Sequence, residues 1–129
     1  LTKYCTEDNK TILELSDDAA NANWGGSWRM PTKAEMEELR DNCTWTWITQ
    51  GNVNGMKVTG PNGKSIFLPA AGGYRGSSLY FTGMFGLYFS STPYESYDYK
   101  AFSQYLHSTY HKVGRYSRYY GRSVRPVSE

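Results

Sequence analysis

The sequence predicts an α+β domain in which two helices come first and a run of short antiparallel strands follows. Helix-start signals occur only in the first third of the chain, whereas apolar and polar residues alternate from residue 44 onward. Glycines separate the later alternating segments, as they do between the strands of an antiparallel sheet. The chain has 129 residues and no internal linker, so we expect residues 1–129 to form a single domain.

The first helix is predicted over residues 17–23. Ser16 is a residue type that caps helices, and the two aspartates that follow it favour the positive end of the helix dipole. Gly25 and Gly26 then end the helix, because glycine favours the conformations that stop one.

The second helix is predicted over residues 33–42. Thr32 and Glu35 have the spacing of a capping box, in which each side chain binds the backbone N–H of the other residue. Met36, Leu39 and Cys43 then recur on one side of the helix, which gives it an apolar face.

The remaining elements are predicted to be strands. Trp45 and Trp47 alternate with polar residues, and Asn54-Gly55 is typical of a tight turn, as is the segment 60–63. The predicted strands span residues 44–49, 56–59, 64–68, 86–90, 101–107 and 122–127.

Charge is divided between the two halves of the chain. Residues 1–43 carry nine acids and five bases, whereas residues 44–129 carry nine bases and three acids. The bases are spaced singly, so we interpret them as a solvated surface and expect no nucleic-acid partner. No run of 18 apolar residues is present, so we expect no transmembrane segment.

The side chains that catalysis requires are missing. The only histidines, His107 and His111, would lie about 13 Å apart on a strand, which is too far to share a metal ion. The glycine-rich segment 72–76 matches no phosphate-binding fingerprint. The acidic residues of the second helix are interpreted as a solvated face. We therefore expect no enzymatic activity, no metal and no cofactor.

Cys5 and Cys43 are the only cysteines. They are either two buried thiols or one disulfide. We favour the disulfide in an oxidising compartment, where closing a loop of this length contributes about 3–4 kcal/mol to stability.

Tyrosine is crowded into one part of the chain. Ten of the twelve tyrosines lie between Tyr80 and Tyr120, whereas none of the seven asparagines follows Asn62. Alternate residues of a strand point inward, so part of this aromatic set belongs to the core. Tyr80, Tyr88 and Phe89 are the strongest core candidates.

The segment 23–35 resembles the signature Trp-Gly-x-x-Trp-Arg-Met-Pro-Thr-x-x-Glu of the Fibrobacter succinogenes major paralogous domain family. Four later segments resemble that family in the same order, at residues 42–45, 65–72, 90–93 and 121–127. The resemblance implies a C-type lectin-like fold, with two helices flanking a small twisted antiparallel sheet with long loops. Family members usually carry further residues before the position of Leu1.

Some members of this family resemble the variable proteins of diversity-generating retroelements, which mutate adenines at the 3′ end of their own gene. Asparagine codons change most, to Tyr, Phe, Ser, His or Arg among others, and the loss of Asn beside the gain of Tyr fits that process. By changes at their first two bases, asparagine codons cannot become codons for Lys, Gln, Glu, Met or Trp. Five residues are excluded from the diversified set on this ground: Met84, Glu95, Lys100, Gln104 and Lys112.

The resemblance therefore implies a binding module that uses tyrosines as antibody paratopes do, against an unknown protein or glycan ligand. The family occurs largely in gut Bacteroidetes and their phages, which implies an extracellular, cell-surface or phage-particle location. The candidate contact residues are Phe81, Phe85, Leu87, Tyr94, Tyr97, Tyr99, Phe102, Tyr105, His107, Tyr110, Arg115, Tyr116, Ser117, Tyr119 and Tyr120.

Other functions remain open at this point. A carbohydrate-binding domain of fixed specificity would also use aromatic rings, although the calcium motifs Glu-Pro-Asn and Trp-Asn-Asp of C-type lectins are absent. A structural surface or pilus-tip domain would leave the tyrosine crowding unexplained. The formylglycine-generating enzymes act through cysteines in their C-terminal part, and this chain has none after Cys43.

Overall fold

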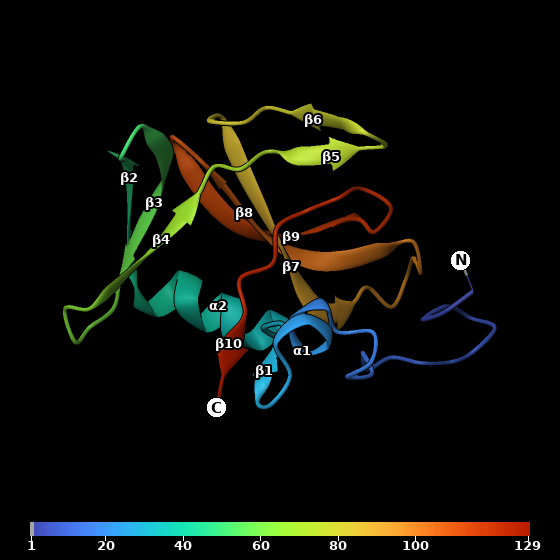
Figure 1. The fold of residues 1–129 in the computed structure, drawn as a ribbon. Coiled ribbons are helices and arrows are strands. Elements are labelled where there is room, and N and C mark those ends of the chain that lie inside the picture. The colour runs from blue at the N-terminus through green and yellow to red at the C-terminus, as the bar shows by residue number, and fades with distance from the viewer. Residues whose placement is uncertain (1) are drawn as a thin grey trace.

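A computed structural model describes residues 2–129 and shows a fold dominated by strands, with 45% of residues in strands and 12% in helices. The strands of this described part form several small separate sheets (Figure 1). The expected α+β arrangement, two helices flanking one twisted sheet, is therefore wrong, and so is the C-type lectin-like fold inferred from the resemblance. Tyrosine favours strands, and the tyrosine-rich part of the chain forms more of them than predicted.

Figure 1 labels the helices and strands in the order in which they follow along the chain. The helices are α1 (Ala19–Trp24) and α2 (Lys33–Asn42). The strands are β1 (Trp28–Arg29), β2 (Thr44–Gln50), β3 (Val53–Thr59), β4 (Ser65–Pro69), β5 (Gly73–Arg75), β6 (Ser78–Tyr80), β7 (Phe85–Pro93), β8 (Lys100–His107), β9 (Tyr110–Ser117) and β10 (Val127–Ser128).

Two three-stranded antiparallel sheets, β2–β3–β4 and β7–β8–β9, form the centre of the molecule. The β5–β6 hairpin lies beyond one end of the β7–β8–β9 sheet, and the β1–β10 pair lies near the other end (Figure 1). Strand β9 is an edge strand, because β8 is its only ladder partner among the described residues.

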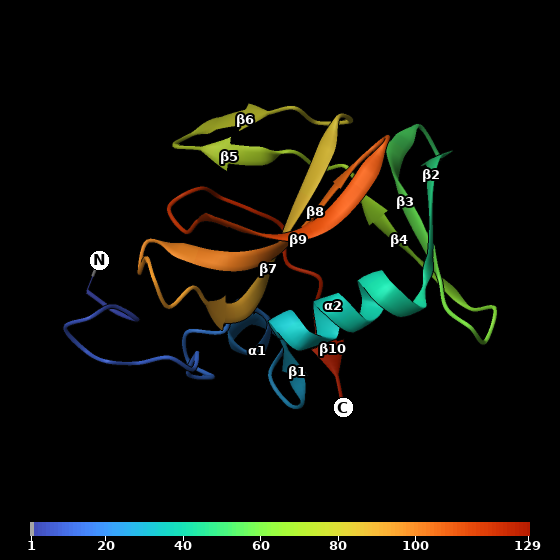
Figure 2. The same cartoon turned by 180° about the vertical axis from the view of Figure 1, so that it is seen from behind.

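Helix α2 follows its prediction at both ends. Thr32 Oγ1 accepts from Glu35 N at 3.2 Å and Glu35 Oε1 accepts from Thr32 N at 2.9 Å, so the capping box is confirmed. Arg29 also binds the Glu35 carboxylate with both guanidinium nitrogens, at 2.6 and 3.0 Å. This pairing, together with the Thr32 bonds, lowers the pKa of Glu35 to about 2. Helix α2 runs from the β1–β10 pair toward the start of β2 (Figure 2).

Helix α1 begins two residues later than predicted, and its cap is Asp18 instead of Ser16. The Asp18 carboxylate is only 4% exposed, and it accepts from Ala20 N, Asn21 N and Met30 N. These bonds replace the water that the buried charge loses and tie α1 to the chain that leads into α2.

The hairpin between β2 and β3 turns at Gly51-Asn52, so the turn predicted at Asn54-Gly55 is wrong. Both residues of the observed turn have positive φ, as a two-residue hairpin loop requires. Gly55 lies inside β3, where a Cβ would come within 2.4 Å of Leu68 O. A close approach of two strands, and not a turn, therefore explains this glycine.

The hydrophobic core lies where α2 and the two large sheets meet. Its buried members come from α2, β3, β4, the residue after β4, β7 and β8: Met36, Met56, Val58, Leu68, Ala70, Tyr88 and Leu106. Trp45, Trp47 and Leu39 pack against this group and are partly buried. The apolar stripe predicted for α2 thus faces the core.

The C-terminal segment differs from its prediction. Only Val127 and Ser128 form a strand, so the strand predicted over 122–127 is wrong. Ser123 instead binds the outer edge of β7, donating from its N to Leu87 O and accepting from Phe89 N, both at 3.0 Å. This segment therefore covers part of β7.

Cys5 and Cys43 are not joined by a disulfide in the described chain. Cys5 lies in a loop and lines the same cavity as Thr92, and the Thr92 hydroxyl accepts from the N–H of Lys33, the first residue of α2. Cys43 lies at the opposite end of α2, packed against the core. Ten helical residues span about 15 Å, whereas a disulfide needs Cα atoms within about 7 Å, so the predicted bridge is wrong.

No helix among residues 2–129 combines the length and the apolar character that a bilayer span requires. The longer helix, α2, has ten residues and carries several charged side chains.

Candidate functional site

The β7–β8–β9 sheet has two faces with different surroundings. Residues paired across an antiparallel sheet share a face, so Leu106 and Gln104 lie on one face and Tyr105 on the other. The first face meets α2 and the β2–β3–β4 sheet, because Leu106 and Tyr88 belong to the core there. We call it the core face, and we call the opposite one the ring face.

Tyr105 is at the centre of the ring face. Its ring centroid lies 5.6 Å from that of Phe85, 5.4 Å from Tyr110 and 6.0 Å from Tyr116. Lys112 lies over the same ring at 6.0 Å. Burial, followed by the hydrogen bond with Tyr110, raises the pKa of Tyr105 to about 12, so this phenol is neutral at pH 7.

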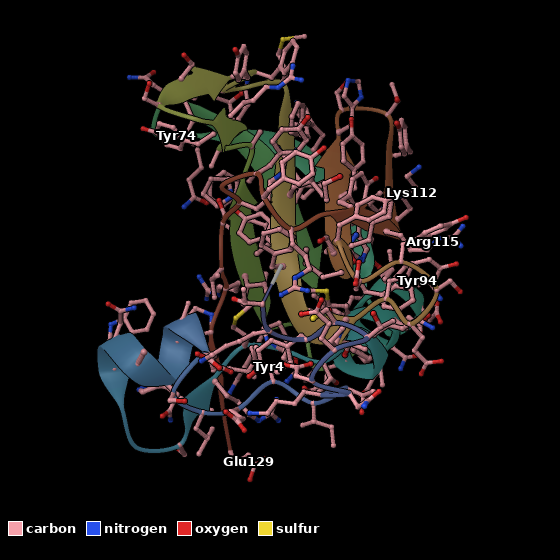
Figure 3. The ribbon with its side chains drawn as sticks, turned by 90° about the vertical axis from the view of Figure 1, so that its right-hand side faces the viewer. Tyr4, Tyr74, Tyr94, Lys112, Arg115 and Glu129 are labelled. Carbon is pink, nitrogen blue, oxygen red and sulfur yellow. The ribbon has the colours of Figure 1, made fainter. Side chains whose placement is uncertain are left out.

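The ring contacts continue along the sheet in both directions. Phe81 connects Phe85 to Tyr80, and Tyr110 connects Tyr105 to His107. The ring face, as we use the term, consists of Tyr80, Phe81, Phe85, Tyr105, His107, Tyr110, Tyr116, Tyr119 and Tyr120. Figure 3 looks onto this side of the molecule, with Tyr74 at its upper left and Lys112 at its right.

A cavity of about 300 Å³ opens between the β5–β6 hairpin and the segment after β9. Its walls are mostly aromatic, and its only charged residues are two arginines; it is lined by Gly73, Tyr74, Arg75, Tyr80, Phe81, Phe85, Tyr120 and Arg122. Backbone bonds between Tyr74 and Gly121, at 2.7 and 2.8 Å, hold its two sides together. This volume is at the lower end of the range for small-ligand sites.

Arg122 is packed between aromatic rings. Its guanidinium carbon lies 5.0 Å from the ring centre of Tyr120 and 6.0 Å from that of Phe85. A Cβ on residue 73 would come within 2.2 Å of Arg122 Nη1, so glycine at that position leaves room for the guanidinium. Burial lowers the pKa of Arg122 from its ordinary value.

A second aromatic group lies beside the edge strand and consists of Tyr94, Tyr97, Tyr99, Phe102 and Arg115. Arg115 Nη1 donates to Tyr94 Oη at 2.7 Å, and its guanidinium lies over the Tyr94 ring at 4.9 Å. Lys33 of α2 lies over Phe102 at 4.5 Å. Figure 3 shows Tyr94 and Arg115 below Lys112 in this view. By the strand register Phe102 and Arg115 pair with each other and lie on the core face of the sheet, at the end where Lys33 contacts Phe102. We call this set the Tyr94 group.

In the described part of the chain, the basic residues that follow residue 43 are not paired with acidic side chains. Every ion pair found among residues 2–129 has its cation at or before Arg40. The nine bases beyond residue 43 form none, although Arg118 and Arg115 donate to backbone and phenol oxygens. The ring face and its surroundings therefore carry uncompensated positive charge.

Most of the candidate contact residues belong to the ring face or the Tyr94 group, but Leu87 and Ser117 do not. Leu87 is 2% exposed, because the segment around Ser123 covers its part of β7, so its prediction as a contact residue is wrong. Ser117 is half-buried at the end of β9. Tyr119 is the most exposed of the aromatic candidates, at 67%.

The core predictions were partly right. Tyr88 is 6% exposed and donates to Pro69 O at 2.7 Å, so its burial is confirmed. Tyr80 is 42% exposed on the β5–β6 hairpin, and its prediction as a core residue is wrong. Phe89 is half-buried. The hairpin that exposes Tyr80 was not anticipated from the sequence.

Several residues beside the rings were missed. Arg75 and Arg122 line the cavity, and Lys112 lies over Tyr105. Lys112 was excluded only because asparagine codons do not become lysine codons, which does not bear on contact with a ligand. The excess of bases over acids after residue 43 was the signal that could have identified these cations.

The two histidines lie on opposite faces of the β8–β9 hairpin. His107 pairs with Tyr110 on the ring face, whereas His111 pairs with Leu106 and stacks on Trp45 at 4.2 Å. Burial, followed by the charge of Arg40, lowers the pKa of His111. The imidazoles thus point away from each other across the sheet.

No family model, curated protein or solved structure matches the chain. The family resemblance found in the sequence accordingly stays a prediction, and the site has to be interpreted from its own chemistry.

Proposed function

We propose that this chain is a binding module that recognises a protein or cell-surface ligand through the ring face and the Tyr94 group. We further propose that a retroelement diversifies these residues, as the sequence resemblance implies. An extracellular, cell-surface or phage-particle location belongs to the same proposal.

One observation carries the proposal. The contact residues were selected by their place in the sequence and by which codons asparagine codons can become. Five of them come together as neighbouring rings on one face of one sheet: Phe85, Tyr105, His107, Tyr110 and Tyr116. By the strand register Phe102 and Arg115 lie on the opposite face, within the Tyr94 group, so that group is a second patch of the proposed surface. Leu87 is buried, which removes it from the proposed set.

The chemistry of the surface supports recognition of a macromolecule. Tyrosine offers a large contact area with few rotatable bonds, and it combines an apolar ring with a polar hydroxyl. Phe81, Tyr97, Tyr110 and Tyr119 are each about half exposed or more, which places aromatic area in contact with water. Exposed aromatic surface of this extent is typical of an interaction site.

Sequencing the DNA around the 3′ end of the gene, in the source genome and in sibling isolates, tests the proposal. We expect a nearby near-copy that differs only at adenines, beside a reverse transcriptase gene. Its asparagine codons should fall at ring-face and Tyr94-group positions. Leu106, Tyr88 and Leu87 are the matched controls, because they lie on the same strands but are buried, and their codons should be unchanged.

The absence of such a copy, with residues 94–120 identical among siblings, would overturn the diversified-surface proposal. Variation spread evenly over buried and exposed positions of β7 and β8 would overturn it as well, since it would not follow the ring face.

A further inference from the structure

The cavity beside the ring face holds two cations and no acid. The guanidinium carbons of Arg75 and Arg122 lie 5.5 and 5.0 Å from the ring centre of Tyr120. No Asp or Glu is among the residues that line the cavity. Two like charges against one ring repel each other, so an anion between them would lower the energy of the arrangement.

Arg122 is held in position although at least one of its N–H donors has no hydrogen-bond acceptor in the described chain. Its Nε is buried and has no hydrogen-bond acceptor among residues 2–129. A guanidinium has five N–H donors, and a buried donor without an acceptor is costly. Gly73 and the flanking rings nevertheless fix the group in this place. Since the buried Nε is closed to a ligand, an acceptor from outside the chain would bind the part of the guanidinium that lines the cavity.

The lining favours an acidic side chain over a neutral sugar. No Asp, Glu, Asn or Gln of residues 2–129 lines the cavity, so the only side-chain acceptors it offers to sugar hydroxyls are the phenol oxygens of its tyrosines. Planar guanidinium groups match a carboxylate, which accepts two parallel N–H bonds. The walls formed by Phe81, Phe85 and Tyr80 suit an apolar neighbour of that carboxylate.

We propose that the ligand of the ring face is a protein that places an Asp or Glu, next to an aromatic or aliphatic residue, in the cavity between Arg75 and Arg122. This inference rests on the proposed binding function and names the chemistry of the partner. The unpaired bases around the site attract an acidic protein surface and repel a basic one.

A library of random 12-residue peptides displayed on phage and selected against the protein tests this inference. We expect the enriched peptides to contain Asp or Glu beside an apolar residue. The affinity of one enriched peptide is then measured by fluorescence anisotropy for the wild type, Arg75→Gln, Arg122→Gln and Lys64→Gln. The Arg75 and Arg122 variants should bind about 10-fold more weakly or worse, since each loses charge-assisted hydrogen bonds.

Two controls keep the result interpretable. Lys64 is exposed in the turn between β3 and β4, outside the ring face, so Lys64→Gln removes the same charge and should bind as the wild type does. Arg75 is exposed on β5, so its variant remains informative even where Arg122→Gln does not fold. Replacing the acidic residue of the peptide by its amide should reproduce the loss with the protein unchanged.

The other outcomes are distinct. Enriched peptides without acids that bind all four proteins equally would overturn the acidic-ligand inference and leave the binding function standing. Failure to enrich peptides, with binding of a sulfated or uronate glycan on an array, would overturn the protein partner. Failure of both peptides and glycans to bind would overturn the binding function itself.

Discussion

The two faces of the β7–β8–β9 sheet are made by the same strands, yet they differ in how their side chains are held. On the core face, Tyr88 is buried and its hydroxyl donates to Pro69 O. On the ring face, Tyr105 is half-buried, and its neighbours are other rings and Lys112. The core face packs against α2 and the second sheet, whereas the opposite face is covered by the chain only in part, around Leu87, and exposes Tyr110 to solvent.

Under the proposed function, this difference would let one strand separate stability from recognition. Successive residues of β8 alternate between the faces, so Leu106 can be kept for packing while Tyr105 and His107 vary. If the proposed function holds, a change at an exposed ring-face position would alter what the protein contacts without altering what holds the sheets together. The predictions below measure that separation, beginning with the largest effect.

Leu106→Ala should destabilise the protein most. The Leu106 side chain is 0% exposed in the core, and truncating such a residue typically costs about 2–5 kcal/mol of unfolding free energy. Chemical denaturation monitored by circular dichroism measures the effect. A loss below about 1 kcal/mol would mean that the core face is not what stabilises the sheet.

Tyr88→Phe should have a smaller effect, and Tyr105→Phe a smaller one still. The first variant removes the hydrogen bond to Pro69 O, which is worth about 1 kcal/mol, and leaves a buried carbonyl without that donor. The second keeps the ring contacts of Tyr105 on the solvent-facing side. Denaturation of the two variants in parallel compares the faces directly, and equal losses would contradict the distinction.

Each face also contains one phenol whose pKa rises from its ordinary value of 10.0 to about 12. Burial raises the pKa of Tyr88 to about 12, and burial together with Tyr110 raises that of Tyr105 to about 12. Both groups keep their protons longer in the folded state, so stability should fall as the pH rises from about 10 to about 12. Absorbance titration near 295 nm should show one fewer late-titrating phenol in Tyr88→Phe and in Tyr105→Phe.

Tyr119→Ala should change stability least. Tyr119 is 67% exposed, and surface substitutions usually change the free energy of unfolding by no more than about 0.5 kcal/mol. Thermal unfolding of the variant measures this. A drop of several degrees would show that the Tyr119–Tyr120 ring contact supports the fold and would remove Tyr119 from the proposed binding surface.

The parts of the fold that were predicted depend on local signals. Helix α2 was predicted at both ends because Thr32 and Glu35 are three residues apart and interact with each other. Gly55 was misassigned because the atom that requires a glycine there, Leu68 O, lies on the neighbouring strand. Strands β5, β6 and β9 were missed for a similar reason, since strands in a glycine-rich region are defined by their pairing partners.

The candidate site follows the same rule. Tyrosine crowding indicated Tyr105, Tyr110 and Tyr116, because their residue type carries the signal. Arg122 was missed because its position against Tyr120 and Phe85 arises only when the segment after β9 folds back along β7. The cavity is therefore a product of tertiary structure that no local pattern in the sequence records.

The unpaired edge of β9 has a consequence for self-association. A strand edge next to aromatic surface is a template on which a second copy of the chain could add a strand, and charged side chains oppose that pairing. Lys112 and Arg115 are both exposed on this strand. Under the proposed diversification Arg115 can be replaced, which leaves Lys112 as the other exposed cation of the strand. The charge at position 112 would then oppose the addition of a strand from a second copy.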